Sequence, residues 1–115
     1  MSGEARPETG TLDDAPAGGS VFVHLSVHHP LPGREDELAD SMDRFGAPAH
    51  GRPGFRFHAT LRDPDAGVLV GITIWDSKEA WEAAVPFQRS AVEHDAVDEL
   101  WERPPEVYRL ETRPR

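Results

Sequence analysis

One stretch of ten residues constrains the fold more than any other: residues 71–80 read GITIWDSKEA. Its first residues have strand character and end at Trp75, and Asp-Ser-Lys-Glu-Ala then opens a helix. Asp76 can cap the first turn of this helix, and Glu79 can reach back to complete a capping box. The stretch predicts a strand-to-helix junction with Trp75 at its mouth, a place where open sheets covered by helices tend to bind ligands.

The region before this junction predicts a strand and then a helix. From residue 21 to residue 28 the side chains alternate with a period of two, which is typical of a strand with two different faces. Acidic residues at 35–37 favour a helix start, and Leu38, Met42 and Phe45 follow at helical spacing. The two predicted strand faces are Val21, Val23, Leu25 and Val27 on one side and Phe22, His24, Ser26 and His28 on the other.

The second half of the chain predicts a hairpin, a helical region and a last strand. Turn residues at 63–67 join a strand at Phe55–Leu61 to one at Val68–Trp75. We expect a short helix at about Lys78–Val85 that Pro86 interrupts, and a second one at about Phe87–Trp101. Pro104 and Pro105 should end the helical region before a strand at Glu106–Glu111.

This order of elements predicts an α+β fold, the ferredoxin-like split βαβ sandwich, in which helices cover one face of a four-stranded antiparallel sheet. The other face would then be bare and apolar, formed by alternate residues of Val21–Val27 and Val68–Ile74. A bare apolar patch of this size is typical of an interface. We therefore expect a two-fold homodimer in which two sheets pack face to face.

The composition limits the classes of protein to which this chain can belong. The chain of 115 residues suits a single domain. We expect this domain at residues 20–112, between a disordered tail at 1–19 and a short polar tail at 113–115. A formal net charge of -9 argues against a nucleic-acid partner. The chain has no cysteine, no apolar run long enough to cross a membrane and no recognisable signal peptide, which predicts a cytoplasmic protein without a membrane partner.

Several of these features resemble a known family. Pro53-Gly54-Phe55 at the start of a strand, and GITIWDSKEA before a helix with Ser90 and His94, resemble the antibiotic-biosynthesis-monooxygenase domains of the dimeric α+β barrel superfamily. The resemblance covers about Val21 to Glu111. It implies a ligand pocket between the sheet and the helices of each protomer, and for many members an oxygenase activity that needs no metal or organic cofactor.

Two branches of that family can be compared residue by residue. The haem-degrading branch has a helical His that matches His94, but its Asn and its Trp fall on Ser26 and Ala84, so haem degradation is disfavoured. The quinone-forming branch has aromatic residues that match Trp75 and Trp81. Its strand Asn falls on Gly71, and its helical Arg falls near His94 if one gap is allowed.

Histidines are the main candidates for chemistry. On a continuous helix His94 would lie in an apolar stripe, as either a core residue or a catalytic base, and the resemblance favours the base. His24 is the second candidate, Ser26 a hydrogen-bond donor, and His28 is read as solvated near the end of its strand. No metal site is expected, because strand residues four apart lie about 13 Å from one another. A metal site that joins His24 to His58 on another strand is kept as an alternative.

These observations lead to one leading hypothesis and two alternatives. The leading one is a small cofactor-independent monooxygenase that oxidises an aromatic, polyketide-like phenol, anthrone or hydroquinone, with molecular oxygen as co-substrate. His94 and His24 would be catalytic, and Ser26, Trp75, Trp81, His58 and Gly71 would bind the substrate. The alternatives are a non-catalytic ligand-binding or accessory protein, and a polyketide isomerase or cyclase on the same fold.

Overall fold

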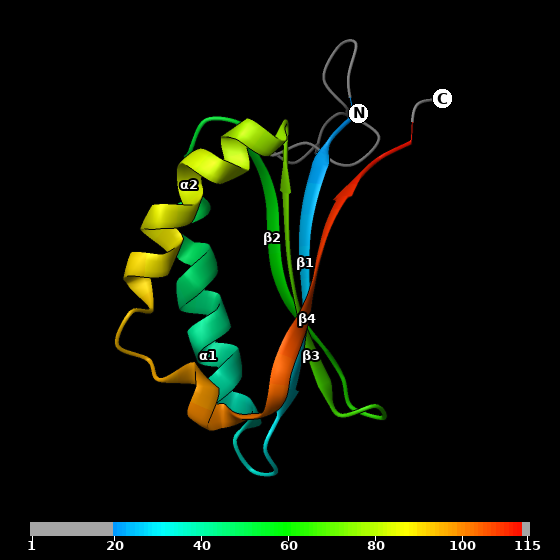
Figure 1. Ribbon diagram of the computed structural model, residues 1–115, viewed down its shortest axis with the longest axis vertical. Coiled ribbons are helices and arrows are strands. Elements are labelled where there is room, and N and C mark those ends of the chain that lie inside the picture. Colours follow the sequence, from blue (N-terminus) through cyan, green and yellow to red (C-terminus); the bar gives the residue numbers. More distant parts are fainter. Residues whose placement is uncertain (1–19, 114–115) are drawn as a thin grey trace, which may run out of the picture.

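The computed structural model describes residues 20–113, and the predicted tail at residues 1–19 lies outside this range. Four antiparallel strands form one sheet in the order β2-β3-β1-β4, and the two helices α1 and α2 lie on one face of it (Figure 1). The predicted ferredoxin-like α+β fold is therefore confirmed. The elements are β1 at Phe22–Pro30, α1 at Glu35–Gly46, η3 at Ala47–Ala49, β2 at Phe55–Asp63, β3 at Val68–Trp75, α2 at Lys78–Ala91, η4 at Val97–Leu100 and β4 at Trp101–Glu111.

Helix α1 forms where its sequence pattern predicts it. Its first turn holds Glu35, Asp36 and Glu37, whose negative charges favour the positive end of the helix dipole. One turn later its apolar face begins, and Leu38 and Met42 are buried against the sheet. They pack with Leu69 of β3 and with Leu100 of η4, so this cluster holds α1 and η4 against the sheet.

Helix α2 begins at the predicted place but with a different cap. The hydroxyl oxygen of Ser77 accepts a hydrogen bond from the backbone N–H of Ala80 at 3.1 Å. The prediction that Asp76 caps this helix is wrong, because Asp76 lies one residue too early. Its carboxylate instead forms an ion pair with Arg56, which ties the junction to β2 at an N···O distance of 3.2 Å.

The predicted break at Pro86 and the predicted second helix are also wrong. Helix α2 runs through Pro86 and ends at Ala91. A turn follows in which Ala96 adopts the left-handed conformation with φ of 45°, and η4 leads directly into β4. Pro104 and Pro105 lie inside β4 and do not precede it. An edge strand tolerates proline because half of its backbone N–H groups face away from the sheet.

The main core lies under the upper half of α2. Trp75, at 0% exposure, packs with Phe22, Ala49, Trp81 and Ala84. The rings of Phe55 and Trp75 meet edge to face with centroids 5.4 Å apart, a favoured aromatic geometry. These contacts hold the strand-to-helix junction in place.

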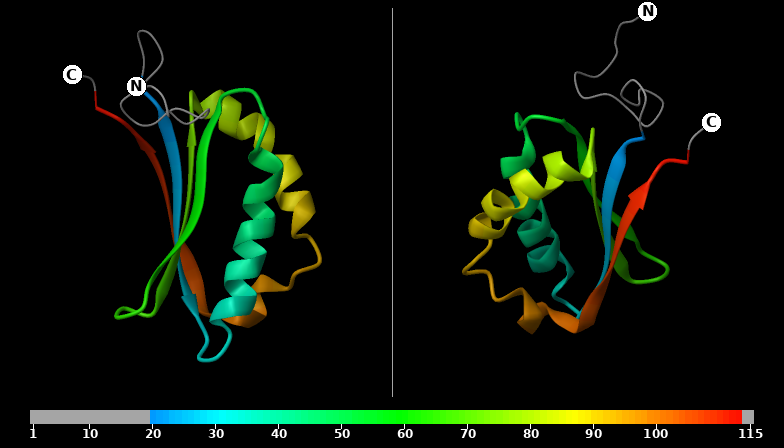
Figure 2. Two further views of the ribbon diagram at one scale, coloured as in Figure 1. Left: turned by 180° about the vertical axis from the view of Figure 1, so that it is seen from behind. Right: turned by 45° about the horizontal axis from the view of Figure 1, so that its top comes forward.

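The opposite face of the sheet carries no helix (Figure 2). Val21, Val23 and Ile74 form an apolar cluster there, with Leu25 and Ile72 packed against it. Further large apolar side chains, which the sequence analysis did not assign to this face, remain exposed to solvent there. They are Phe57, Leu61, Tyr108 and Leu110, with exposed fractions of 43–51%. The predicted dimer through this face stays a prediction. No helix within residues 20–113 is long and apolar enough to cross a membrane.

Candidate functional site

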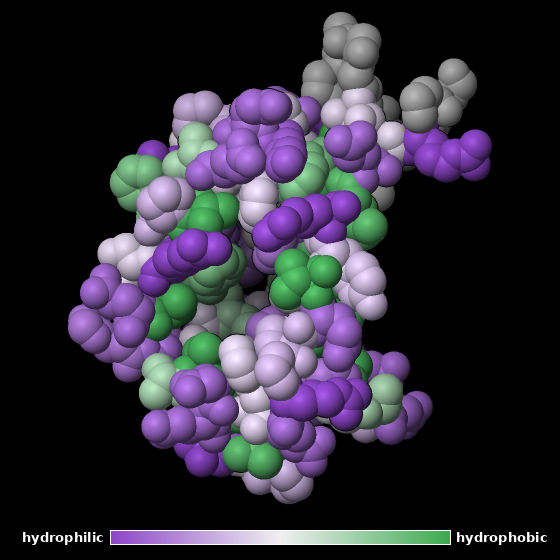
Figure 3. Space-filling model, viewed as in Figure 1, coloured by the Kyte–Doolittle hydropathy of each residue, from purple (hydrophilic) through white to green (hydrophobic). Residues whose placement is uncertain are grey.

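A cavity of about 240 Å³ lies between the sheet and the helices. Figure 3 shows the molecule hollowed between the helical layer and β4. Val92 and Val97, which flank the connection from α2 to η4, line one side of the cavity, and Pro105 and Val107 of β4 line another. The remaining lining residues are His24, Ser26, His28, Leu38, Ser41, Met42, Phe45, His58, Gly71, Ile72 and Thr73.

Strand register builds the floor of this cavity. Ser26 of β1 pairs with Gly71 of β3, and His24 pairs with Thr73. On the other side of β3, His58 of β2 also pairs with Thr73. Because paired residues project to the same face of a sheet, these side chains converge beneath the helices.

Two glycines make room for the polar side chains. A Cβ at residue 71 would lie 3.1 Å from Ser26 Oγ and 3.2 Å from Met42 Cε, so the missing side chain keeps the floor open. At the end of α1, a Cβ at residue 46 would overlap the imidazole ring of His58. Gly46 therefore allows this ring to lie directly against the helix.

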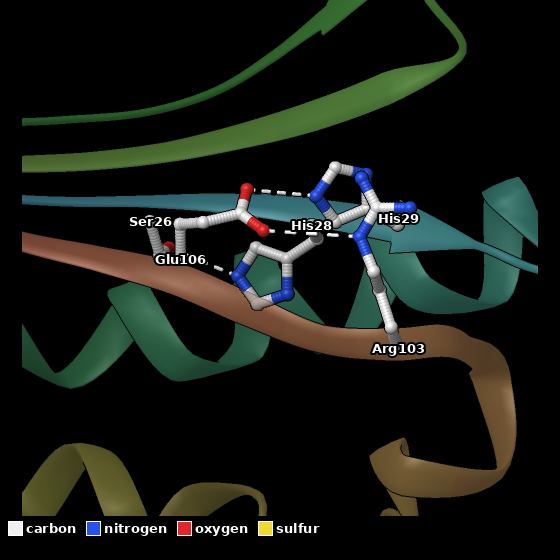
Figure 4. A network of polar contacts seen from close by, with 5 residues as sticks. All are labelled: Ser26, His28, His29, Arg103 and Glu106. Atoms are coloured by element: carbon white, nitrogen blue, oxygen red, sulfur yellow. Dashed lines mark hydrogen bonds and ion pairs between the residues drawn. The ribbon is translucent and has the colours of Figure 1, made fainter.

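Some polar groups of the cavity have hydrogen-bond partners among the described residues and others have none. His28 Nε2 and Ser26 Oγ form a hydrogen bond of 2.9 Å, and the neighbouring His29 Nε2 bonds Glu106 Oε1 at 2.7 Å (Figure 4). His28 Nδ1 and Thr73 Oγ1 are buried without a hydrogen-bond partner among the described residues. Such atoms are rare in native structures, and both belong to residues that line the cavity.

The cavity favours neutral imidazoles. Burial lowers the pKa of His24, and the charge of Arg109 adds to this effect. Burial also lowers the pKa of His58, assisted by His50 and opposed by Asp43. For His28, burial and then the charges of His29 and His24 lower the pKa to about 4, against a smaller opposite effect of Glu106. Apolar surroundings disfavour the charged form, so all three rings are neutral at pH 7 and can accept protons.

The structure brings together four of the predicted site residues: His24, Ser26, His58 and Gly71 all line the cavity. It adds two that the sequence reasoning left out. His28, read as solvated, lines the cavity floor, and Thr73 does so as well. Both lie on the helix-facing side in the period-two alternation, and that signal could have found them.

The other three predicted site residues lie outside the cavity. Trp75 is fully buried in the core, and Trp81 is 8% exposed behind His24, with the two ring centroids 5.3 Å apart. His94 follows the end of α2, its side chain is 91% exposed, and its Nε2 lies 3.5 Å from Glu93. The prediction that His94 lies in an apolar helical stripe is wrong, because the helix ends at Ala91.

The donor set for a metal ion is limited. Within residues 20–113 no three His, Asp or Glu side chains lie close enough together to hold one. The rings of His50 and His58 are neighbours, with centroids 6.0 Å apart and planes at 83°.

Comparison with known proteins shows the fold. No family model and no curated protein matches the sequence. Among solved structures, Rv0793 from Mycobacterium tuberculosis is 22% identical, with a TM-score of 0.66 over 84% of this chain and 98% of that one. A protein from Chloroflexus aurantiacus named as a putative antibiotic biosynthesis monooxygenase is 21% identical, with a TM-score of 0.61 over 83% and 93%. A similarly named protein from Caulobacter crescentus is 13% identical, with a TM-score of 0.64 over 84% and 92%. The chain has the fold of the antibiotic biosynthesis monooxygenase domains.

Proposed function

We propose that the protein is a small monooxygenase that uses molecular oxygen, without metal or organic cofactor, to oxidise a compact planar phenol, anthrone or hydroquinone. The observation that supports this most is the cavity, in which neutral imidazoles stand among apolar walls. Its volume of about 240 Å³ lies just below that of typical small-molecule pockets. We therefore favour a planar substrate of one to three fused rings.

The proposed chemistry needs a base, a partner for the oxyanion and a dry pocket. Removal of a proton from an anthrone gives a delocalised anion that can transfer an electron to O2. Recombination forms a C–O bond and, after protonation, a hydroperoxide. Loss of water from this hydroperoxide leaves a carbonyl, so a CH2 group and O2 become C=O and H2O.

We assign the base to His24. Its ring nitrogens form no hydrogen bond with residues 20–113, and the stacked Trp81 ring holds the imidazole in place. The neutral form, favoured by burial, is the form that can accept a proton. His24 therefore replaces His94, the first sequence candidate, which lies in solvent.

His28 is better suited to hydrogen bonding than to proton removal. With a pKa of about 4, accepting a proton from a phenol of pKa about 10 would cost about 8 kcal/mol. The bond to Ser26 orients the His28 ring and leaves Nδ1 without a partner among the described residues. We propose that His28, Ser26 and Thr73 bond the substrate oxygens.

Oxygen uptake tests the proposal. A panel of anthrones, hydroquinones and phenols is incubated with the protein under air, and oxygen consumption and product formation are followed. We expect His24→Gln to lower kcat by about 100-fold or more, the usual range for a general base, whereas the exposed His94→Gln should keep full activity. If His24→Gln matches the wild type the base is wrongly assigned, and if no member of the panel consumes oxygen the function is wrong.

One observation favours the second candidate, a ligand-binding protein without turnover. Gly71 stands where the quinone-forming branch has an Asn, so the floor offers no polar side chain there. Under this alternative the panel would bind without consuming oxygen. Turnover under nitrogen would instead indicate an isomerase or cyclase, in which His24 moves protons without oxygen.

A further inference from the structure

Arg109 holds a distinct place beside the cavity. It lies on the edge strand β4, directly opposite His24 in the β1–β4 ladder. Two residues earlier, Val107 projects from the same face of the strand and lines the cavity. The guanidinium carbon of Arg109 lies 5.3 Å from the centroid of the Trp81 ring, which also stacks on His24. His24 and Arg109 thus share one aromatic neighbour at this end of the cavity.

The charge of Arg109 is not compensated by an ion pair within residues 20–113. Glu111 follows two residues later on the same face and forms no ion pair with it. By contrast, Arg103 on the same strand has its Nε 3.9 Å from Glu106 Oε2. The cavity lining includes no Lys, Arg, Asp or Glu side chain, so Arg109 lies next to the lining and not in it, and the titratable groups of the lining are the imidazoles of His24, His28 and His58.

We infer that Arg109 is an electrostatic specificity residue, which favours the phenolate form of an aromatic ligand bound beside His24. The inference rests on the proposed function for its ligand class, but it concerns binding and needs no oxygen. In the step it describes, the phenol O–H bond breaks and the proton passes by way of the His24 imidazole to solvent. Arg109 keeps its protons and offsets the new negative charge.

The size of the effect follows from distance and exposure. An opposite charge within about 4–6 Å lowers the pKa of an acid by about 1–3 units. Arg109 is exposed, and solvent screens its charge. We therefore expect the charge of Arg109 to make the pKa of a phenol bound beside His24 about one unit lower than it would be without that charge, which is a tenfold change in favour of the phenolate.

A coloured phenol tests this directly. 4-Nitrophenol is bound to the full chain, and the visible absorbance of its phenolate is followed across a pH titration. We expect the pKa of the bound dye to be about one unit lower in the wild type than in Arg109→Gln, a difference that is free of the effect of burial on the dye. Arg109→Lys should keep most of this shift. Arg103→Gln, which removes a cation from the same strand, should leave it unchanged.

The outcomes separate this inference from the proposed function. An equal pKa of the bound dye in the wild type and Arg109→Gln, or a loss of the shift in Arg103→Gln, would overturn the role of Arg109. Failure of the dye to bind at millimolar concentration would overturn the ligand class. A lowered pKa in a protein that consumes no oxygen with the phenol panel would instead support Arg109 and reject the monooxygenase. Circular dichroism of each variant checks that the exposed substitution leaves the fold intact.

Discussion

Acidification from pH 7 to pH 4 should destabilise the fold through His28. Its imidazole is neutral in the folded protein because burial, with the charges of His29 and His24, lowers its pKa from 6.5 to about 4. Below pH 6.5 the unfolded chain therefore binds a proton that the folded chain does not. Stability contributed by His28 is fully present above pH 6.5 and is lost as the pH falls toward 4.

The magnitude follows from this shift. Each pKa unit corresponds to about 1.36 kcal/mol, so a shift of about 2.5 units sets an upper limit of about 3.4 kcal/mol on the unfolding free energy that protonation of His28 can remove. At pH 4 the folded imidazole is half protonated, which reduces the limit to about 3 kcal/mol. Because His28 is only partly buried and solvent screens its interactions, we expect about 1.5–2 kcal/mol.

Urea denaturation at pH 7, 5.5 and 4 gives the unfolding free energy at each pH. Comparison of the wild type with a variant that lacks His28 then isolates the contribution of this residue. The wild type should lose about 1.5–2 kcal/mol more unfolding free energy between pH 7 and pH 4 than His28→Gln, which cannot titrate. His94→Gln is the matched control, because this side chain is 91% exposed, and it should lose as much as the wild type. Equal losses in the wild type and His28→Gln would refute the reasoning.

Three further predictions concern the cavity floor, its wall and the outer face of the sheet. Gly71→Val should lower the affinity for 4-nitrophenol at least tenfold at small cost in thermal stability, because a side chain there would press on Ser26; unchanged affinity would place the ligand elsewhere. Asp95→Asn should weaken the bonds of 2.9 and 3.1 Å from Arg44 and lower the midpoint of urea denaturation slightly, with faster hydrogen exchange at residues 92–97; protected amides there would contradict this. Leu25→Asp should turn the proposed dimer into a monomer in light scattering, whereas a wild type that is already monomeric at micromolar concentration would reject the dimer.

The cavity floor was predictable from sequence because strand alternation is a local signal. A period of two assigns His24 and Ser26 to one face, and the hairpin turn at 63–67 sets the register that brings His58 into the same layer. The error at His28 came from its position near the strand end, where exposure depends on what covers it. The structure shows that Val97 of η4 and Pro105 of β4 line the same cavity as His28.

The helical region was harder to predict because its apolar spacing continues past the end of the helix. Val97 and Trp101 fit a helical stripe that begins in α2, yet they belong to η4 and β4. The helix ends at Ala91, and the turn that follows passes through Ala96, whose left-handed backbone is disfavoured for any residue with a Cβ and has no sequence signature. His94 was misplaced because it lies after Ala91, and Phe87, which is inside the helix, is itself 48% exposed.

The two prolines inside β4 have a consequence for how copies of the chain can meet. An edge strand usually offers a row of backbone N–H and C=O groups on which a foreign strand can add. Pro104 and Pro105 have no N–H, and on the opposite edge the register of β2 shifts between Phe55 and Phe57. Growth of the sheet within its own plane is therefore hindered at both borders. The predicted dimer through the apolar face would therefore close after two copies and would not propagate into a fibre.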